Sequence, residues 1–191
     1  MPRATRSTYN VAFRRRREGR TNYNKRLAFL KSGSTRLVAR KTSNQVIVQL
    51  INYSPEGDKV ITTVDNQKLV KMGWFKSKNL PTAYLSGYVA GKEAIKKGVK
   101  GAVLDLGRST PTKSSFAFAV LKGAIDAGLD IPHSETVFDE DRFNGKHISE
   151  YAKKLKESDE ELYKKRFSFY LKNKVDVDKI PGLLDKMKSK M

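Results

Sequence analysis

The sequence predicts an α/β fold, a mixed β-sheet with helices on its faces. Three runs with the alternation or the β-branched residues typical of strands, at 36–41, 45–51 and 59–64, follow one another with only short polar turns between them. After the third run, apolar residues recur at intervals of three and four, and these segments alternate with short apolar stretches. Such an alternation of strands and helices indicates a sheet packed against helices.

The first three runs are predicted to form an antiparallel meander. Residues 43–44 and the Ser-Pro-Glu-Gly-Asp cluster at 54–58 have the composition of turns. Links this short join antiparallel neighbours, because a parallel connection needs a crossover of a dozen or more residues.

A helix is predicted from Asn79 to Gly98. Pro81 suits its first turn and Gly98 suits its end. The apolar residues that recur at helical spacing are Tyr84, Leu85, Tyr88, Val89 and Ile95. The short apolar run at 102–106 then fits a buried parallel strand.

The last elements of the core are predicted to be a helix from Thr110 to Gly128 and a strand at 129–131. Thr110 and Pro111 fit the N-cap and the first helical position, and Pro132 stops the strand. The predicted order is therefore β-β-β-α-β-α-β, with right-handed final crossovers.

The chain divides into three parts. Residues 1–33 are predicted to form an extended basic N-terminal arm, residues 34–134 an α/β core domain, and residues 135–191 a C-terminal helical extension. In the extension, a capping box at 158–161 opens one helix, and a short final helix follows Pro181.

Aromatic residues recur in the extension and just before the first core helix. They are Trp74, Phe75, Tyr163, Phe167 and Tyr170. Such residues are expected to pack on their own domain, and docking into a partner is the alternative.

Charge is the strongest signal of function. The chain of 191 residues has 39 Lys and Arg against 20 Asp and Glu, a net charge of +19, and residues 1–41 hold thirteen of these bases against one acid, Glu18. A run of like charges repels itself and stays extended until a polyanion neutralises it. Because planar Arg groups match phosphate oxygens, nucleic acid is the leading candidate partner.

The candidate RNA-binding residues of the arm lie between residues 13 and 26. The bases would grip phosphates, and the rings between them offer faces on which nucleobases stack. The candidates are Phe13, Arg14, Arg15, Arg16, Arg17, Arg20, Tyr23, Lys25 and Arg26. A solvated tail, a nuclear-import signal and a transit peptide are the alternatives, and the transit peptide is disfavoured because residues 14–17 put charge on every side of a helix.

The loop from Gly107 to Lys113 is the second candidate contact. In the predicted fold it leaves the carboxyl end of a strand and enters a helix N-terminus, where an open sheet presents backbone donors to phosphate. Arg108 and Lys113 flank this loop, and it contains no nucleotide-cofactor motif, so an RNA backbone suits it best. An ordinary capped turn is the alternative.

Composition argues against an enzyme with a cofactor. The absence of Cys excludes disulfides, thiolate catalysis and Cys-based zinc sites, and His133 and His147 are isolated and expected to be structural. The sequence predicts no cofactor, no metal and no small-molecule substrate. Without a run of about 20 apolar residues or a signal peptide, we expect no membrane association and a cytoplasmic location.

A metal-dependent nuclease is the rival function, because the same order of elements describes ribonuclease H-like nucleases. Those enzymes need several carboxylates around two metal ions, usually with one on the first strand. Here the first strand carries bases, so Asp105 is predicted to be structural and to pair with a nearby base or backbone donor. The acidic turn at 139–141 lacks the spacing of a calcium loop.

A DNA-binding regulator would need a polar recognition helix, and the two core helices are too apolar for that role.

Several blocks of sequence, in the same order, resemble one family. They are Phe13-Arg-Arg-Arg-Arg-Glu-Gly-Arg-Thr-Asn-Tyr, Lys25-Arg26-Leu27, Arg36-Leu37-Val38, Ala90-Gly91-Lys92, Ala102-Val103-Leu104-Asp105-Leu106-Gly107, Lys122-Gly123-Ala124 and Ile131-Pro132-His133-Ser134-Glu135. Over most of residues 9–150 the sequence resembles the archaeal-type family of large-subunit ribosomal protein eighteen.

The resemblance implies a protein that binds 5S ribosomal RNA and ties it to the large-subunit RNA in the central protuberance, beside other ribosomal proteins. It also implies a ribonuclease H-like topology without nuclease activity. By position, the family's arm corresponds to residues 13–26 and its RNA-facing loop to residues 107–113.

Overall fold

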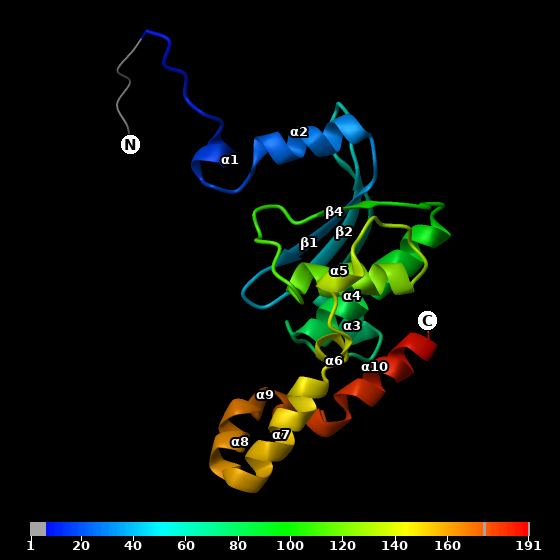
Figure 1. Ribbon diagram of the computed structural model, residues 1–191. Coiled ribbons are helices and arrows are strands. Elements are labelled where there is room, and N and C mark those ends of the chain that lie inside the picture. The colour runs from blue at the N-terminus through cyan, green and yellow to red at the C-terminus, as the bar shows by residue number, and fades with distance from the viewer. Residues whose placement is uncertain (1–6, 174, 191) are drawn as a thin grey trace.

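The computed structural model describes residues 7–173 and 175–190 (Figure 1). Its centre is a four-stranded sheet in the order β3-β2-β1-β4. The strands are β1 (Arg36–Lys41), β2 (Val46–Asn52), β3 (Lys59–Asp65) and β4 (Val103–Asp105). β1 to β3 pair antiparallel and β4 pairs parallel with β1, which confirms the predicted meander and the mixed sheet.

Two long helices, α4 (Leu80–Lys96) and α5 (Phe116–Asp126), cover one face of the sheet. Asn79 is the N-cap of α4, at the predicted helix start, and its side chain accepts a hydrogen bond from the backbone N–H of Thr82. α4 and α5 pack closely because Gly87 and Gly123 stand at their crossing, and a Cβ at either would lie 2.0 Å from a carbonyl oxygen of the other helix.

Three features of the core differ from the predicted order. α5 begins at Phe116 and not at Pro111, because the chain turns through residues 107–115 before Ser115 starts the helix. The predicted strand at 129–131 is reduced to one parallel bridge between Gly101 and Asp130, since the segment is too short for a ladder. A short helix that was not predicted, α3 (Asn66–Lys71), follows β3 and is capped by Asp65.

The N-terminal arm is not extended over its whole described length. It contains α1 (Arg14–Arg17) and α2 (Tyr23–Ser32). The side chain of Asn22 caps α2, and Gly33 ends it in the left-handed conformation, with φ of 64°. Lys, Arg, Leu and Ala are good helix formers, so the local sequence between these caps outweighs the charge repulsion.

The C-terminal extension is helical, as predicted. After a 3₁₀ turn (Glu135–Val137) come α6 (Glu140–Asn144), α7 (Lys146–Ser158), α8 (Glu160–Arg166), α9 (Ser168–Lys172), a second 3₁₀ turn (Val177–Lys179) and α10 (Ile180–Ser189). The cap of α8 is Asp159, one residue beyond the predicted Ser158, and the predicted single helix breaks at Phe167 into α8 and α9.

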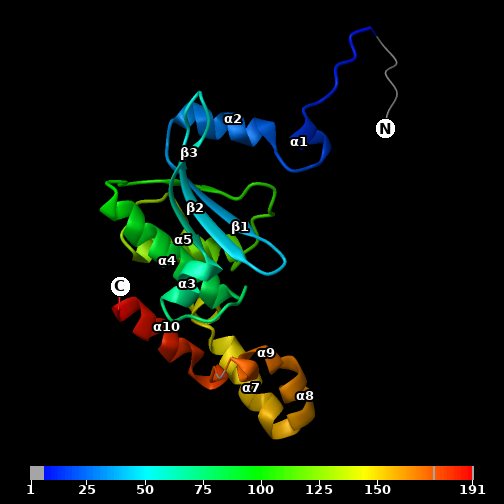
Figure 2. The ribbon, with the colours of Figure 1, turned by 180° about the vertical axis from the view of Figure 1, so that it is seen from behind.

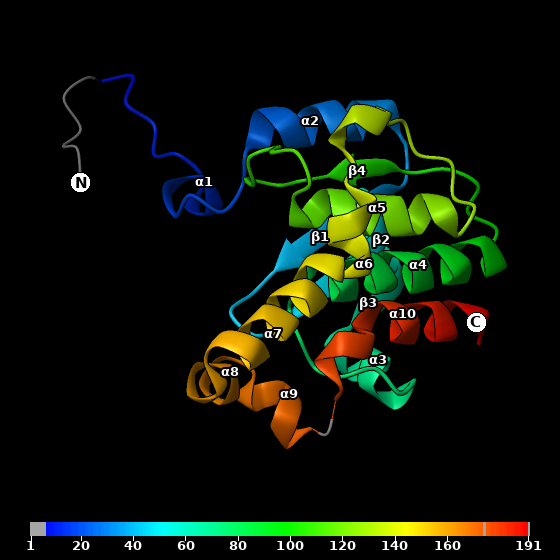
Figure 3. The same ribbon diagram turned by 60° about the horizontal axis from the view of Figure 1, so that its bottom comes forward.

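The extension shares its apolar core with the α/β domain. α10 returns along α4 in Figure 3, and its Leu184 and Met187 are buried in the same cluster as Leu85 and Val89. The aromatic residues predicted to pack on their own domain do so, because Trp74, Phe75, Tyr163 and Phe167 are buried. Tyr170 completes the group through an edge contact with Phe75, at 5.4 Å between ring centroids. Among the described residues, no helix is both long and apolar enough to cross a membrane.

Candidate nucleic-acid interface

The sheet face away from α4 and α5 carries charged residues of the first strand. Along β1, Leu37 and Ala39 are buried in the main core, whereas Arg36, Val38 and Arg40 line a hollow on the other side. Asp105 of β4 is in register with Val38 and therefore stands on this charged face. In Figures 1 and 2, α2 lies on this side of the strands, opposite the α4 and α5 pair.

Asp105 is structural, as the sequence predicted. Its Oδ2 lies 3.3 Å from Nη1 of Arg36 and its Oδ1 lies 3.2 Å from Nη2 of Arg40. The same Oδ1 accepts a hydrogen bond of 2.7 Å from the backbone N–H of Gly107. With Asp105 only 7% exposed and Arg36 only 4%, two basic side chains and one amide hold this buried carboxylate in place.

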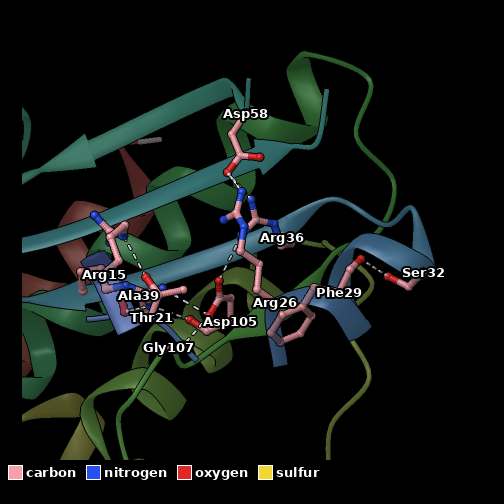
Figure 4. Close-up of polar contacts among 11 residues, drawn as sticks. Arg15, Thr21, Arg26, Phe29, Ser32, Arg36, Ala39, Asp58, Asp105 and Gly107 are labelled. Carbon is pink, nitrogen blue, oxygen red and sulfur yellow. Dashed lines mark hydrogen bonds and ion pairs between the residues drawn. The ribbon is translucent and has the colours of Figure 1, made fainter. Parts of the chain in front are cut away.

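Asp58, in the turn between β2 and β3, connects this cluster to the arm. Its Oδ2 lies 2.7 Å from Nη2 of Arg36 and 2.9 Å from Nη2 of Arg26 on α2 (Figure 4). Burial alone would raise the pKa of Asp58, but the hydrogen bonds from Arg26 and Arg36 outweigh it and lower the pKa below 3.8. Asp58 thus remains charged at neutral pH and fixes α2 to the sheet.

The arm encloses a hollow against the sheet, which we call the arm–sheet hollow. Its volume is about 480 Å³. Six cationic side chains line it, namely Arg15, Arg20, Lys25, Arg26, Arg36 and Arg40. Only two carboxylates, Asp58 and Asp105, oppose them, so the hollow attracts anions.

A second hollow of about 400 Å³ lies between the arm and the loop after β4. Arg16, Tyr23, Lys25 and Arg108 are among its lining residues. Arg108 reaches across to the arm, since its Nη1 lies 2.8 Å from the position that a Cβ at Gly19 would occupy. The backbone of Gly19 and the side chain of Arg108 therefore bring the arm and the loop together.

The structure brings seven of the eleven predicted site residues together in these hollows. They are Arg15, Arg16, Arg20, Tyr23, Lys25, Arg26 and Arg108. Phe13 lies next to them, with its ring centroid 5.1 Å from that of Tyr23. Arg14 and Arg17 are exposed on α1 outside both hollows, and Lys113 is exposed on the loop, also outside them.

The prediction that the loop at 107–113 enters a helix N-terminus is wrong. The loop does not run directly into a helix N-terminus, because α5 starts only at Phe116 and Ser115 makes no side-chain cap. The first residues of the loop serve a different purpose. Gly107, with φ of 61°, turns the chain so that its N–H meets Asp105, and Arg108 then points to the arm.

Several residues of the hollows lie outside the two predicted segments, 13–26 and 107–113, and were missed by the sequence analysis. They are Phe29, Arg36, Val38, Arg40, Ile51 and Asp58. The alternation of Arg36, Val38 and Arg40 along the first strand was a usable signal, because it places two bases on one face of the sheet. No local signal marks Asp58 or Ile51, which reach the arm through the tertiary fold.

The acidic groups of this face are engaged by bases and are not arranged as metal ligands. Where a nuclease would have a first-strand carboxylate, Arg36 and Arg40 point at Asp105. In residues 7–173 and 175–190, no three His, Asp or Glu side chains are grouped so that they could hold a metal ion. His133 has a structural contact, since its Nδ1 lies 2.7 Å from the carbonyl oxygen of Ile131.

The fold and this surface define an α/β protein in which a basic arm and the sheet together form a cationic surface. Over residues 7–100 the chain matches the family model described as "Ribosomal large subunit proteins 60S L5, and 50S L18". The chain belongs to this family, so it is a protein of the large ribosomal subunit and not an enzyme.

Proposed function

We propose that this protein binds 5S ribosomal RNA and attaches it to the large-subunit RNA in the central protuberance, next to other ribosomal proteins. Family membership supports this proposal, because the family is one of large-subunit proteins. A core of ribonuclease H-like topology, without nuclease activity, would serve as the scaffold.

One observation carries the proposal, the joining of the arm and the sheet in a single cationic surface. α2 is tied to the sheet through Arg26 and Asp58, and Arg108 of the loop lies against Gly19. The arm supplies affinity through phosphate contacts, while the rigid core orients these contacts and supplies selectivity for one RNA shape.

Co-purification tests the proposal most directly. The protein is isolated from its own cells, and the bound RNA is extracted and identified by length. We expect RNA of the length of 5S ribosomal RNA to be enriched. In vitro, the protein should bind a 5S transcript more tightly than another structured RNA of equal length. Equal affinity for the two RNAs would contradict the proposal.

A matched control separates specific contacts from total charge. The test variant replaces Arg14, Arg15, Arg16 and Arg17 with Ala. The control variant replaces four exposed lysines of the C-terminal extension with Ala, namely Lys153, Lys154, Lys165 and Lys172. Both lose four positive charges, and only the arm variant should lose most of its affinity for 5S RNA.

A further inference from the structure

We propose that the arm–sheet hollow holds one unpaired nucleotide of the RNA, with its base inserted between α2 and the open face of the sheet. This inference rests on the proposed function and specifies what its central surface recognises. It commits to a single unstacked nucleotide and not to a base-paired segment.

The size and the walls of the hollow fit one nucleotide. A volume of about 480 Å³ is within the usual range for small-molecule pockets and is far too small for a duplex. Apolar side chains form part of the wall on both sides, Phe29 from α2 and Val38 and Ile51 from the sheet. Flat nucleobases are bound on such surfaces, most strongly where an aromatic ring is present.

The cations of the hollow differ in their exposure to solvent. Arg36 and Arg40 are held by carboxylates at the floor, and Arg36 is almost completely buried. Arg20 and Lys25 are exposed and come from the arm. A phosphate at the exposed side would therefore meet the cations of the arm while the base reaches the floor.

The lining of the hollow offers hydrogen-bonding groups that have no partner within residues 7–173 and 175–190. Nε of Arg36 is buried and has no partner within residues 7–173 and 175–190. In the same part of the chain, only Oδ2 of Asp58 accepts hydrogen bonds, from Arg26 and Arg36, and Oδ1 has no partner (Figure 4). An unsatisfied buried donor is rare in proteins, and because Arg36 lines the hollow, a small shift of its side chain would let Nε meet a ligand acceptor.

These free groups favour an unpaired base. The Watson–Crick edge of every nucleobase presents at least one N–H donor, which suits a carboxylate oxygen such as Oδ1 of Asp58. In a base pair those donors are already used, and the stacked neighbours would not fit the hollow. We therefore infer recognition of a loop, bulge or end nucleotide.

The first test fills the hollow without changing any charge. Ile51→Phe adds volume at the sheet wall, and Ile47→Phe adds the same volume on the same face of β2 outside the hollow. At fixed salt, Ile51→Phe should weaken binding of a 5S transcript roughly 5- to 100-fold, in the range expected for the loss of one stacked base. Ile47→Phe should bind within about twofold of the unchanged protein, the size of effect expected of a surface change.

A second pair approaches the hollow from the helix, in case Ile51→Phe does not fold. Phe29→Ala removes the aromatic wall, and Leu27→Ala is its control, because Leu27 is exposed on the same helix and does not line the hollow. Thermal unfolding establishes that each variant is folded before its affinity is compared. Only Phe29→Ala should weaken binding, by a factor in the same range.

Chemical probing then identifies the nucleotide. A reagent that modifies free Watson–Crick edges should react with at least one unpaired nucleotide of free 5S RNA that the bound protein protects. In the complex with Ile51→Phe, that nucleotide alone should become reactive again. If Ile51→Phe and Phe29→Ala both fold, bind as well as their controls and leave the protection unchanged, the inference is wrong.

A short RNA distinguishes failure of this inference from failure of the proposed function. The protein is titrated with a twelve-nucleotide single strand and with the same strand in a duplex. The hollow predicts that Ile51→Phe weakens binding of the single strand and leaves duplex binding unchanged, whether or not 5S RNA is the natural partner. If Ile51→Phe weakens binding of the single strand only, but the unchanged protein shows no preference for 5S RNA, the proposed function alone is wrong. If the protein prefers 5S RNA, but Ile51→Phe affects binding of the single strand and of the duplex equally, the inference alone is wrong.

Discussion

Nη2 of Arg26 lies 2.9 Å from Oδ2 of Asp58, so a helix of the basic arm is tied to the turn between β2 and β3. No residue of α2 is buried, and the helix therefore has little apolar contact with which to hold its position. The same oxygen of Asp58 also contacts Arg36, which is buried in the sheet. Asp58 therefore links α2 to a fixed position on the sheet.

Asp58→Asn is predicted to release α2 while the core remains folded. The substitution removes the charge that Arg26 and Arg36 share, and we expect the free energy of unfolding to fall by about 1–3 kcal/mol. Trypsin should then cut residues 23–32 faster than in the unchanged protein. Glu56→Gln is the control, since it removes an exposed charge from the same turn. Equal cleavage rates in the two variants would contradict this role of Asp58.

The Asp58 contact should also depend on pH. Its pKa is lowered below 3.8 in the folded protein, so its contribution to stability is complete above the pKa of the unfolded chain and is lost as the pH falls through the folded value. The stability difference between the unchanged protein and Asp58→Asn should therefore be constant above about pH 5 and shrink toward zero as the pH falls below about 4. Urea titrations at several pH values measure it, and a difference that grows on acidification would contradict the assignment.

Asp105→Asn is predicted to be strongly destabilising and to have no catalytic consequence. Arg36 is buried, and losing one of its two carboxylate partners should cost about 2–4 kcal/mol in the free energy of unfolding. Asp130→Asn, at an exposed position beyond the cluster, should cost little. Neither the unchanged protein nor the variant should cleave RNA with magnesium or manganese. Metal-dependent cleavage that disappears in Asp105→Asn would contradict the structural role.

Gly87→Ala and Gly123→Ala are each predicted to force α4 and α5 apart. The new methyl group would lie 2.0 Å from a backbone oxygen, of Val120 or Tyr84 respectively, and a backbone atom cannot move aside as a flexible side chain can. Each should lower the free energy of unfolding by more than about 2 kcal/mol, as measured by the urea midpoint. Gly182→Ala is the control, because nothing lies within 4 Å of its Cβ position and α10 should gain helix propensity.

The fold was predictable where local patterns were long. The alternation over residues 36–64 and the caps of α4 were enough to place the meander and the first core helix. Short elements were not predictable, because the three residues at 129–131 make only one bridge, and Thr110-Pro111 has the composition of a turn as much as of a helix start. The helices of the arm were missed because its charge was weighed above the capping residues Asn22 and Gly33.

The candidate site was predictable in one half only. Charge density along the chain located the arm, since that signal is local. The sheet half depends on contacts between residues far apart in sequence, such as Arg36 and Asp105, which are 69 positions apart. In the sequence, Arg36 and Arg40 added to the basic charge and argued against a nuclease, whereas their position in the lining of a hollow required the structure.

The arginine run supplies the last prediction, because α1 exposes all four of its side chains and buries none. Each phosphate contact releases counterions, so the slope of log K against log salt reports how many contacts form. Replacing Arg14, Arg15, Arg16 and Arg17 with Ala should reduce that slope by about 3–4 if all four engage RNA, at roughly 0.7–0.9 per contact.

The same titration also shows whether the arm and the loop contribute differently to affinity and to preference for 5S RNA. Preference for 5S RNA over a structured RNA of equal length should fall less than total affinity does in the arginine variant. Arg108→Ala with Lys113→Ala should erode that preference more, because Arg108 lies at the junction of the arm and the core. Lys113 stands outside both hollows, so Arg108→Ala alone should account for most of the second effect. An unchanged salt slope in the arginine variant would mean that the run is a solvated tail, and the affinity would then have to come from the hollows alone.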